Sequence, residues 1–413
     1  MSTLEQPVHR PWSGPRGRAR TRVQHAMVGA FALMLVGLAA GASGQVVQDT
    51  AQRRPFVEGG VYDKPYLGRL LGRTAVGGYA EAHARWQRVD GATEEAGFVP
   101  KRFNLFTATQ VSDFVRVGAE LEFEEGTEEI KLEFAAIDVI IHPSLSLRGG
   151  MILSPLGRFN LSHDSPLNEF TDRPLVSTDL LGVALSEPGF GLLGQIPLGG
   201  MARLTYEVYA VNGFHDGVIT DAEDGTRVPL GRANVEDANA SPALVGRLAW
   251  SPRIGLELGM SAHRGAWNVF EVEGVRVDER RDLTLAVLDF EADAAGFAFS
   301  GEAATMSVDL PAGLEGVNAS AQRGLFLDVV RPFGAGWVPT MPGSYFAAKL
   351  RLEAVDFDTD LAGDDTRRVS LGLNFRPTRD TVLKLDWVRG RTRDRFENAS
   401  DAAALLFSLA TYF

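Results

Sequence analysis

The chain of 413 residues carries 41 basic and 53 acidic side chains, a net charge of −12, and no cysteine. The lack of cysteine excludes a disulfide framework and a lipid anchor on a cysteine, and the acidic balance argues against nucleic acid as a partner, because nucleic-acid affinity comes mainly from basic surfaces. Glycine is abundant at 45 residues and the mean hydropathy of −0.04 is close to neutral. These values fit either a soluble β protein or a membrane barrel in which apolar and polar residues alternate.

The N-terminal part of the chain has the organisation of an export signal. Five arginines between Arg10 and Arg22 precede an apolar run over residues 26–40, and small residues follow it at 41–44. This order predicts a cleaved secretory signal peptide over residues 1–44, because the run is shorter than the roughly 20 residues that a membrane-spanning helix needs. Its removal takes away five of the 41 basic and one of the 53 acidic side chains, which leaves a net charge of −16.

Residues 45–73 separate this signal from the first predicted strand. The stretch begins with polar residues and continues as GGVYDKPYLGRLLG, which is denser in apolar residues. We expect a periplasmic N-terminal segment, whose second part either plugs the following domain or packs beneath it.

From Thr74 to Phe413 the sequence repeats segments of alternating residues, each followed by a turn. In FVRVGAELEFEE (114–125) the apolar residues share one parity and the charged residues the other, which is the period-two pattern of a strand with one apolar face. We therefore predict an all-β fold, a transmembrane antiparallel β-barrel of about 16 strands over residues 74–413. The predicted strands are 74–88, 101–110, 114–124, 129–141, 145–155, 182–196, 201–213, 243–251, 254–267, 281–291, 297–309, 323–332, 344–357, 366–377, 380–391 and 402–413.

The connections between these strands alternate in length. Those after even-numbered strands are tight, such as VSD and SPR, with the longer GAGWVPTMPG as an exception, whereas most of the others are longer and more polar. Short periplasmic turns and long extracellular loops are typical of outer-membrane barrels. An open edge would leave unpaired backbone groups in the bilayer, so the last strand, 402–413, is predicted to pair with the first, 74–88.

The last strand ends in an aromatic residue after an alternating apolar stretch, ALLFSLATYF (404–413). This ending resembles the C-terminal signal of Gram-negative outer-membrane barrels, which implies recognition by the barrel-assembly machinery. The residues of this predicted assembly signal are Phe407, Leu409 and Phe413. Thr411 departs from the pattern, because an aromatic residue often stands two positions before the end.

Two further stretches, GGYAEAHARW (77–86) and RGGMILSPLGRFNLSHDSPLNEFTDRPLV (148–176), carry a family resemblance. They resemble the phosphate-selective porin O and P superfamily and its porin-like relatives. The resemblance implies an outer-membrane porin with a water-filled channel for passive diffusion of small hydrophilic solutes or ions, with anions such as phosphate among the candidates. A passive channel needs no nucleophile, so we expect no enzymatic activity and no cofactor. The expected partners are outer-membrane lipid and lipopolysaccharide, with a homotrimer as a candidate assembly.

The connection over residues 156–181 is the candidate constriction, since in porins the corresponding loop folds into the lumen. The residues of this constriction loop are Arg158, Asn160, His163, Asp164, Glu169, Asp172 and Arg173. Facing it, the polar parity of the early strands supplies a predicted pore wall of Glu81, His83, Arg85, Arg102, Arg116, Lys131 and Arg148. We expect a ladder of cations opposite an acid-bearing loop, because arginine stays charged and holds anions or carboxylates with a planar fork. The alternatives are a solvent-exposed surface loop, and wall arginines that only neutralise Glu120, Glu133 and Glu207.

No metal site is predicted. The stretch DFDTDLAGDD (356–365) is similar to a calcium loop, but Leu361 stands where the loop needs glycine and Arg367 where it needs glutamate. Aromatic residues on the apolar parity predict an interfacial girdle made of Trp86, Trp250, Trp267, Trp387 and Tyr206.

Three other functions compete with the porin. A barrel without a channel would serve a structural or adhesive role. An outer-membrane lipase would need a serine and histidine pair on the lipid-facing side, and no histidine stands on an apolar parity beside a serine. A soluble secreted β-sandwich would hide its apolar parity inside.

Overall fold

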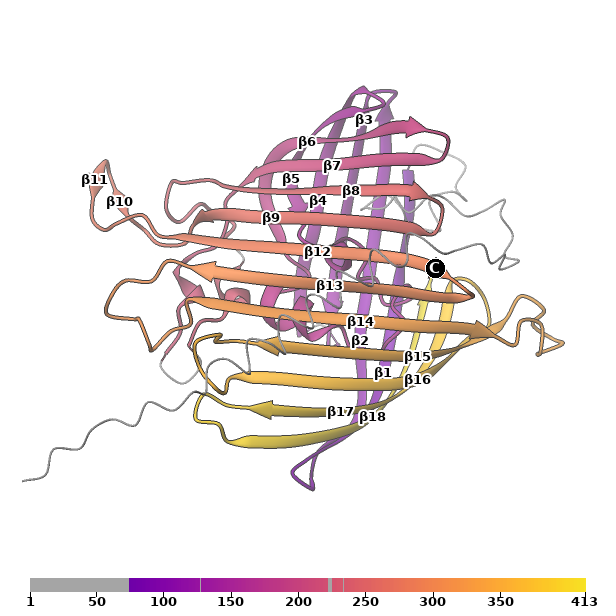
Figure 1. Cartoon of the computed structure of the whole chain (residues 1–413). Coiled ribbons are helices and arrows are strands. Elements are labelled where there is room, and N and C mark those ends of the chain that lie inside the picture. The colour runs from indigo at the N-terminus through magenta and orange to yellow at the C-terminus, as the bar shows by residue number, and fades with distance from the viewer. Residues whose placement is uncertain (1–73, 127, 222–224, 233) are drawn as a thin grey trace, which may run out of the picture.

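The computed structural model shows one closed barrel of sixteen antiparallel strands (Figure 1). Each barrel strand pairs with the next along the chain, and β1 (Thr74–Val89) pairs with β18 (Ala399–Tyr412). The predicted fold class and strand number are confirmed. The predicted signal peptide and the segment 45–73 lie outside the described residues, which are 74–126, 128–221, 225–232 and 234–413.

Apart from β2, the other barrel strands follow the predicted ranges to within a few residues. They are β2 (Ala92–Ser112), β3 (Val115–Glu124), β4 (Glu129–His142), β5 (Leu145–Leu153), β6 (Ser186–Gly199), β7 (Ala202–Val211), β8 (Ala243–Arg253), β9 (Leu256–Ala266), β12 (Asp282–Ala294), β13 (Phe297–Val308), β14 (Ala321–Phe333), β15 (Tyr345–Asp356), β16 (Asp365–Arg376) and β17 (Thr381–Arg393). A small hairpin of β10 (Glu271–Val272) and β11 (Val275–Arg276) stands outside the barrel sheet.

The two faces of the strands separate by chemistry. On β3 the apolar Leu121 is exposed on the outer surface, whereas its neighbours Glu120 and Glu122 are buried inside the barrel. An apolar outer face and a charged inner face are what a bilayer around a polar interior requires. The alternation in the sequence therefore predicted correctly which side chains of β3 face inward.

The C-terminal residue is held in the seam between the last and first strands. The Phe413 amide donates to the Gly78 carbonyl over 3.0 Å, and the Gly78 amide donates to the Phe413 carbonyl over 3.3 Å. The Phe413 ring stacks on Phe103 of β2 with centroids 5.5 Å apart. The apolar end of the chain is thus paired in the sheet and packed against its neighbour.

The first hairpin differs from the prediction. The predicted strands leave residues 89–100 as a connection, but β2 already begins at Ala92 after a turn at Asp90 and Gly91. Both turn residues have positive φ, 47° and 84°, which is the geometry of the tight turns that the Asp-Gly pair favours. The polar stretch after this turn is strand and not loop.

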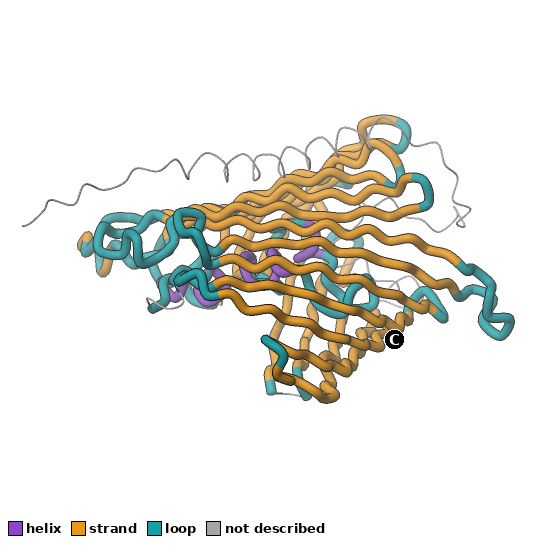
Figure 2. Tube along the Cα trace, turned by 60° about the horizontal axis from the view of Figure 1, so that its bottom comes forward, coloured by secondary structure: helices purple, strands orange, loops and turns teal. Residues whose placement is uncertain are grey.

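Long connections gather at one end of the barrel and short turns at the other, as predicted (Figure 1). The longest, residues 154–185 and 212–242, contain the helices of the described residues: α2 (Arg158–Leu161), η3 (Val176–Leu181), η4 (Asp216–Val218) and η5 (Val228–Gly231). In Figure 2 helical segments are visible behind the strands of the wall. No helix in the described part of the chain is long and apolar enough to span a membrane.

One sector of the interior is apolar, in contrast to the predicted polar lumen. Leu285 and Val287 of β12 point inward and are buried against Val176 and Leu180 of the 154–185 connection. Trp267 belongs to this buried cluster and donates its indole N–H to the Asp309 carbonyl over 3.1 Å. Its assignment to the interfacial girdle was therefore wrong, whereas the other three predicted girdle tryptophans are exposed: Trp86, Trp250 and Trp387.

Candidate functional site: the loop inside the barrel

The connection between β5 and β6, residues 154–185, crosses the barrel interior. Its side chains reach strands on different sides of the closed sheet: Arg158 pairs with Glu257 of β9 over 3.1 Å, and Asp172 pairs with Arg85 of β1 over 2.7 Å. A segment that touches well-separated strands of a closed barrel from within has to lie inside it. The predicted alternative of a loop on the outer surface does not fit these contacts. We call this segment the inner loop.

The neck of the inner loop is closed by Asn160. Its side-chain amide donates to the carbonyls of Ser154 (2.7 Å) and Leu185 (3.0 Å), and its oxygen accepts from the Leu185 amide over 2.9 Å. Asn160 is buried, so the structure places this predicted constriction residue as a brace between the two ends of the loop. Gly157 has a φ of 76° and lies so close to Glu302 that an added Cβ would stand 2.9 Å from the carboxylate. Glycine therefore allows the loop to approach the wall here.

A row of cations on β15 to β17 holds the backbone of the inner loop. Lys384 donates to the carbonyls of Ser165 (2.8 Å) and Phe170 (3.2 Å), and Arg351 donates to the Asp172 carbonyl over 2.7 Å. Sequence reasoning missed this role, although the inward parity of these strands was visible in the sequence. The cations of the row are Lys349, Arg351, Arg368, Arg376 and Lys384.

Two acids of the inner loop pair with cations of this row and with Arg85 of β1. Glu169 pairs with Arg376 over 3.1 Å, and Asp172 pairs with Arg85 and with Arg368. Burial alone would raise the pKa of both carboxyls, but the facing cations outweigh it and hold the pKa of Glu169 and of Asp172 below the ordinary values. Both side chains are therefore carboxylates at neutral pH.

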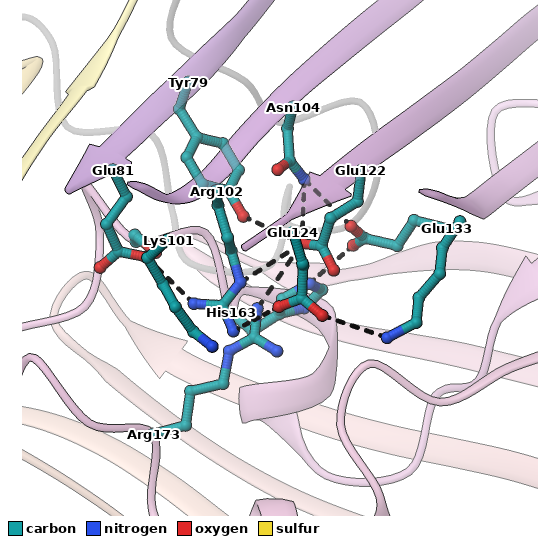
Figure 3. A network of polar contacts seen from close by, with 12 residues as sticks. Tyr79, Glu81, Lys101, Arg102, Asn104, Glu122, Glu124, Glu133, His163 and Arg173 are labelled. Atoms are coloured by element: carbon teal, nitrogen blue, oxygen red, sulfur yellow. Dashed lines mark hydrogen bonds and ion pairs between the residues drawn. The ribbon is translucent and has the colours of Figure 1, made fainter. Parts of the chain in front are cut away.

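An acidic cluster lies on β2 to β4, separated from the cation row by β18 and β1 (Figure 3). The Asn104 amide donates to Glu120, Glu122 and Glu133 over 3.1 to 3.2 Å. His163 of the inner loop places Nε2 2.6 Å from Glu133, and its Nδ1 lies 2.8 Å from the Asn160 carbonyl. Burial opposes a charge on His163, but the Glu133 carboxylate outweighs it and raises the pKa of the imidazole.

Two more predicted loop residues reach this acidic side of the barrel. Asp164 accepts a hydrogen bond from the Tyr412 hydroxyl over 2.7 Å. Arg173 lies 3.9 Å from Glu122, and Figure 3 shows its guanidinium pointing toward the acidic cluster. The inner loop is thus anchored on both walls.

The predicted pore-wall residues point inward, and their charges are paired. Arg102 bridges Glu81 (3.0 Å) and Glu124 (2.7 Å). Arg116 and Arg148 share Asp138. The remaining pairs are His83 with Glu81, Lys131 with Glu124 and Glu129, Arg148 with Glu207, and Arg85 with Glu95 and Asp172. The predicted pore-wall cations therefore form ion pairs with neighbouring carboxylates. This arrangement fits the alternative of wall arginines that neutralise acids better than a ladder of cations that face the lumen alone.

A cavity of about 400 Å³ lies between the inner loop and strands β12 to β15. Arg158, Glu291, Glu302 and Arg351 line it, together with aromatic rings such as Phe326. The volume falls in the range that takes small molecules. The lining of this cavity beside the inner loop is thus partly aromatic and partly charged.

No group of three or more histidine and acidic side chains in the described part of the chain is arranged to hold a metal ion. In the stretch 356–365, Asp364 pairs with Arg227 over 3.3 Å and Asp358 lies 3.6 Å from Arg395. These two acids therefore form ion pairs with arginines of other connections between the strands.

Comparison with known proteins bears on the fold. No family model matches the chain. A protein of Aquifex aeolicus (strain VF5) that is described as uncharacterized is 26% identical over 383 residues, which cover 83% of each chain. Among solved structures, an anion-selective porin from Comamonas acidovorans has a TM-score of 0.52 at 11% identity over 82% of this chain and 99% of its own. Salmonella typhi OmpF in complex with daunomycin has a TM-score of 0.53 at 11% identity, over 82% and 97%. Pseudomonas putida OprB has a TM-score of 0.53 at 9% identity, over 83% and 94%. The chain has the general porin fold.

Proposed function

We propose that this protein is an outer-membrane porin that forms a water-filled channel for passive diffusion of small hydrophilic solutes or ions. The observation that supports this function is that charged side chains line the inside of the barrel, around the inner loop that crosses it. Charged side chains inside a protein are costly unless they are paired or wet, and a channel provides both conditions. The purified protein should give stepwise ion conductance in planar lipid bilayers. A correctly folded barrel that stays silent would end this proposal.

Selectivity is the finer part of the proposal. The resemblance to the phosphate-selective O and P porins makes anions such as phosphate one candidate solute. The pairing of the wall cations weakens that candidate, because Arg102, Arg116 and Arg148 all face carboxylates. We therefore propose general diffusion, with phosphate as a solute to be tested and not as the defining one.

Arg116 offers a direct test of the path, since its side chain is 34% exposed and lies on the inner face. Arg116→Ala should shift the reversal potential in a potassium chloride gradient toward cations. Arg367→Ala is the matched control, because that side chain is 72% exposed, on the opposite parity to the inward-facing Arg368. Equal reversal potentials for Arg116→Ala and the unchanged protein would remove Arg116 from the conducting path.

The remaining elements complete the proposal. Residues 1–44 export the chain, Phe407, Leu409 and Phe413 are read by the barrel-assembly machinery, and the mature barrel sits among lipid and lipopolysaccharide of the outer membrane without enzymatic activity. A structure of Vibrio cholerae OmpT in trimer form, with a TM-score of 0.50, supports a homotrimer as the assembly to be tested by chemical cross-linking in membranes.

A barrel without a channel is the second candidate. The apolar cluster inside the β12 to β15 sector favours it, because apolar packing removes part of the cross-section from water. The bilayer recording decides between the two.

A further inference from the structure

The connection between β14 and β15, residues 334–344, differs from its neighbours at the short-turn end. Other turns at this end have two to four residues, such as 254–255 and 377–380. This one projects past them in both views of the barrel (Figures 1 and 2). Its sequence, GAGWVPTMPGS, contains no charged residue.

The connection is ordered by its own backbone. The Gly336 amide donates to the Ser344 carbonyl over 3.1 Å, and the Trp337 amide donates to the Gly334 carbonyl over 3.1 Å. Gly334 has a φ of 66°, and an added Cβ would stand 2.9 Å from the Trp337 ring. Glycine at 334 therefore permits both the turn and the position of the indole.

The indole lies on the outer surface of the barrel. Trp337 packs edge-on against Phe333 with centroids 5.7 Å apart, and lies 6.2 Å from Phe346. Phe346 in turn packs 4.9 Å from Phe375 of β16. Phe333, Phe346 and Phe375 stand on the strand parity opposite to the inward Asp328, Arg351 and Asn374, so this aromatic row continues the apolar outer face.

Trp337 is 68% exposed and Met341 is also exposed. An exposed aromatic ring on an uncharged projection is unfavourable in water, whereas the headgroup layer of a bilayer accommodates the apolar body and the N–H of indole together. The outer face of the barrel is already the lipid-facing surface of this fold, and the projection extends it beyond the rim. Arg331 stands beside it, with its guanidinium 5.1 Å from the Phe297 ring centroid, in reach of the same layer.

We propose that residues 334–344 form a membrane foot that inserts Trp337 and Met341 into the phospholipid headgroup layer at the short-turn end of the barrel. The partner is the lipid surface itself. This inference does not depend on whether the barrel conducts.

The chain contains no cysteine, so a single introduced cysteine can be labelled selectively. Met341→Cys carries an environment-sensitive fluorophore in full-length processed protein reconstituted in phosphatidylethanolamine and phosphatidylglycerol vesicles. Thr378→Cys, in the polar turn 377–380 at the same end, is the matched control. Heat-modifiable migration on detergent gels verifies that both labelled barrels are folded.

Phospholipid spin-labelled near the headgroup should quench the label at 341 at least about threefold more than the label at 378, with blue-shifted emission at 341. Trp337→Asp in the Met341→Cys background should reduce the quenching to the level of the control. Water-like emission and equal quenching at both positions would overturn the proposal. Energy transfer between donor-labelled and acceptor-labelled copies without lipid quenching would overturn it in favour of a second copy of the chain as the partner.

Discussion

Lys384→Met tests whether the wall cations hold the inner loop in place. Lys384 is 1% exposed, and its ammonium donates to two loop carbonyls, Ser165 and Phe170. Methionine keeps the length of the stem and removes only the charged donor. The substitution therefore deletes two hydrogen bonds without opening a large cavity.

The expected effect follows from these two bonds. Hydrogen bonds to a charged group are worth about 1.5 to 3 kcal/mol each, so the pair amounts to roughly 3 to 6 kcal/mol. Burying the Lys384 ammonium also costs desolvation free energy, and the methionine variant no longer has this cost. The net loss of local stability in the loop is therefore smaller than the two bonds alone, and we expect about 2 to 4 kcal/mol. At about 1.4 kcal/mol per tenfold change, this corresponds to roughly 30- to 700-fold faster local opening.

Hydrogen exchange measured by mass spectrometry on peptides that cover residues 165–171 reads this opening directly. Lys101→Met is the control, because the pair of Lys101 with Glu125 is 24% and 50% exposed and is worth about 1 kcal/mol at most. The control should leave exchange in the loop unchanged. Identical exchange of the loop in Lys384→Met and in the unchanged protein would refute the role of this cation as an anchor.

Three more outcomes are expected. The raised pKa of His163 means that its pair with Glu133 stabilises the loop fully below the ordinary imidazole pKa, and that this contribution is lost as the pH rises through the higher folded-state pKa. The protection factors of the loop amides, which are corrected for the base-catalysed intrinsic exchange rate, should therefore fall in alkaline buffer, and His163→Gln should remove that fall. Arg351→Leu leaves the buried Asp328 without its 2.6 Å partner and should destabilise the barrel by about 3 to 5 kcal/mol in denaturant unfolding, and the added change Asp328→Asn should restore part of the loss. Phe413→Ala keeps the backbone pairing of the seam but removes the ring stack, so refolded protein should keep its heat-modifiable band while the yield of folded barrel in cells falls; an unchanged yield would remove Phe413 from the assembly signal.

The barrel was predictable because the bilayer imposes a strict rule on each strand. On β3 the rule places Leu121 outside and Glu120 inside, and the same alternation recurs along the chain. The rule says nothing about turns inside a polar stretch. The Asp90 and Gly91 turn was overlooked because the residues after it are polar and resemble a loop, although the Asp-Gly pair itself favours a tight hairpin.

The same rule fails where the interior is not water. Leu285 of β12 is apolar and points inward, whereas Leu288 of the same strand is exposed on the outer face. Period-two alternation distinguishes two faces only when they meet different surroundings, and here the inner face meets Val176 and Leu180 of the inner loop. Where the inner loop packs against a strand, apolar residues therefore occur on both faces of that strand.

The site was predictable only as a list of inward charges. The parity of β15 placed Lys349 and Arg351 inside, but their partners lie far away in the sequence: Arg351 donates to a carbonyl 179 residues distant, and Lys384 to one 219 residues distant. No local pattern encodes such a pair, because a closed barrel brings early and late strands to one lumen only after the last strand has met the first. The charges of the inner loop acquire their partners through that closure, so any change that weakens the seam should also loosen the loop, and the two effects should appear together in hydrogen exchange.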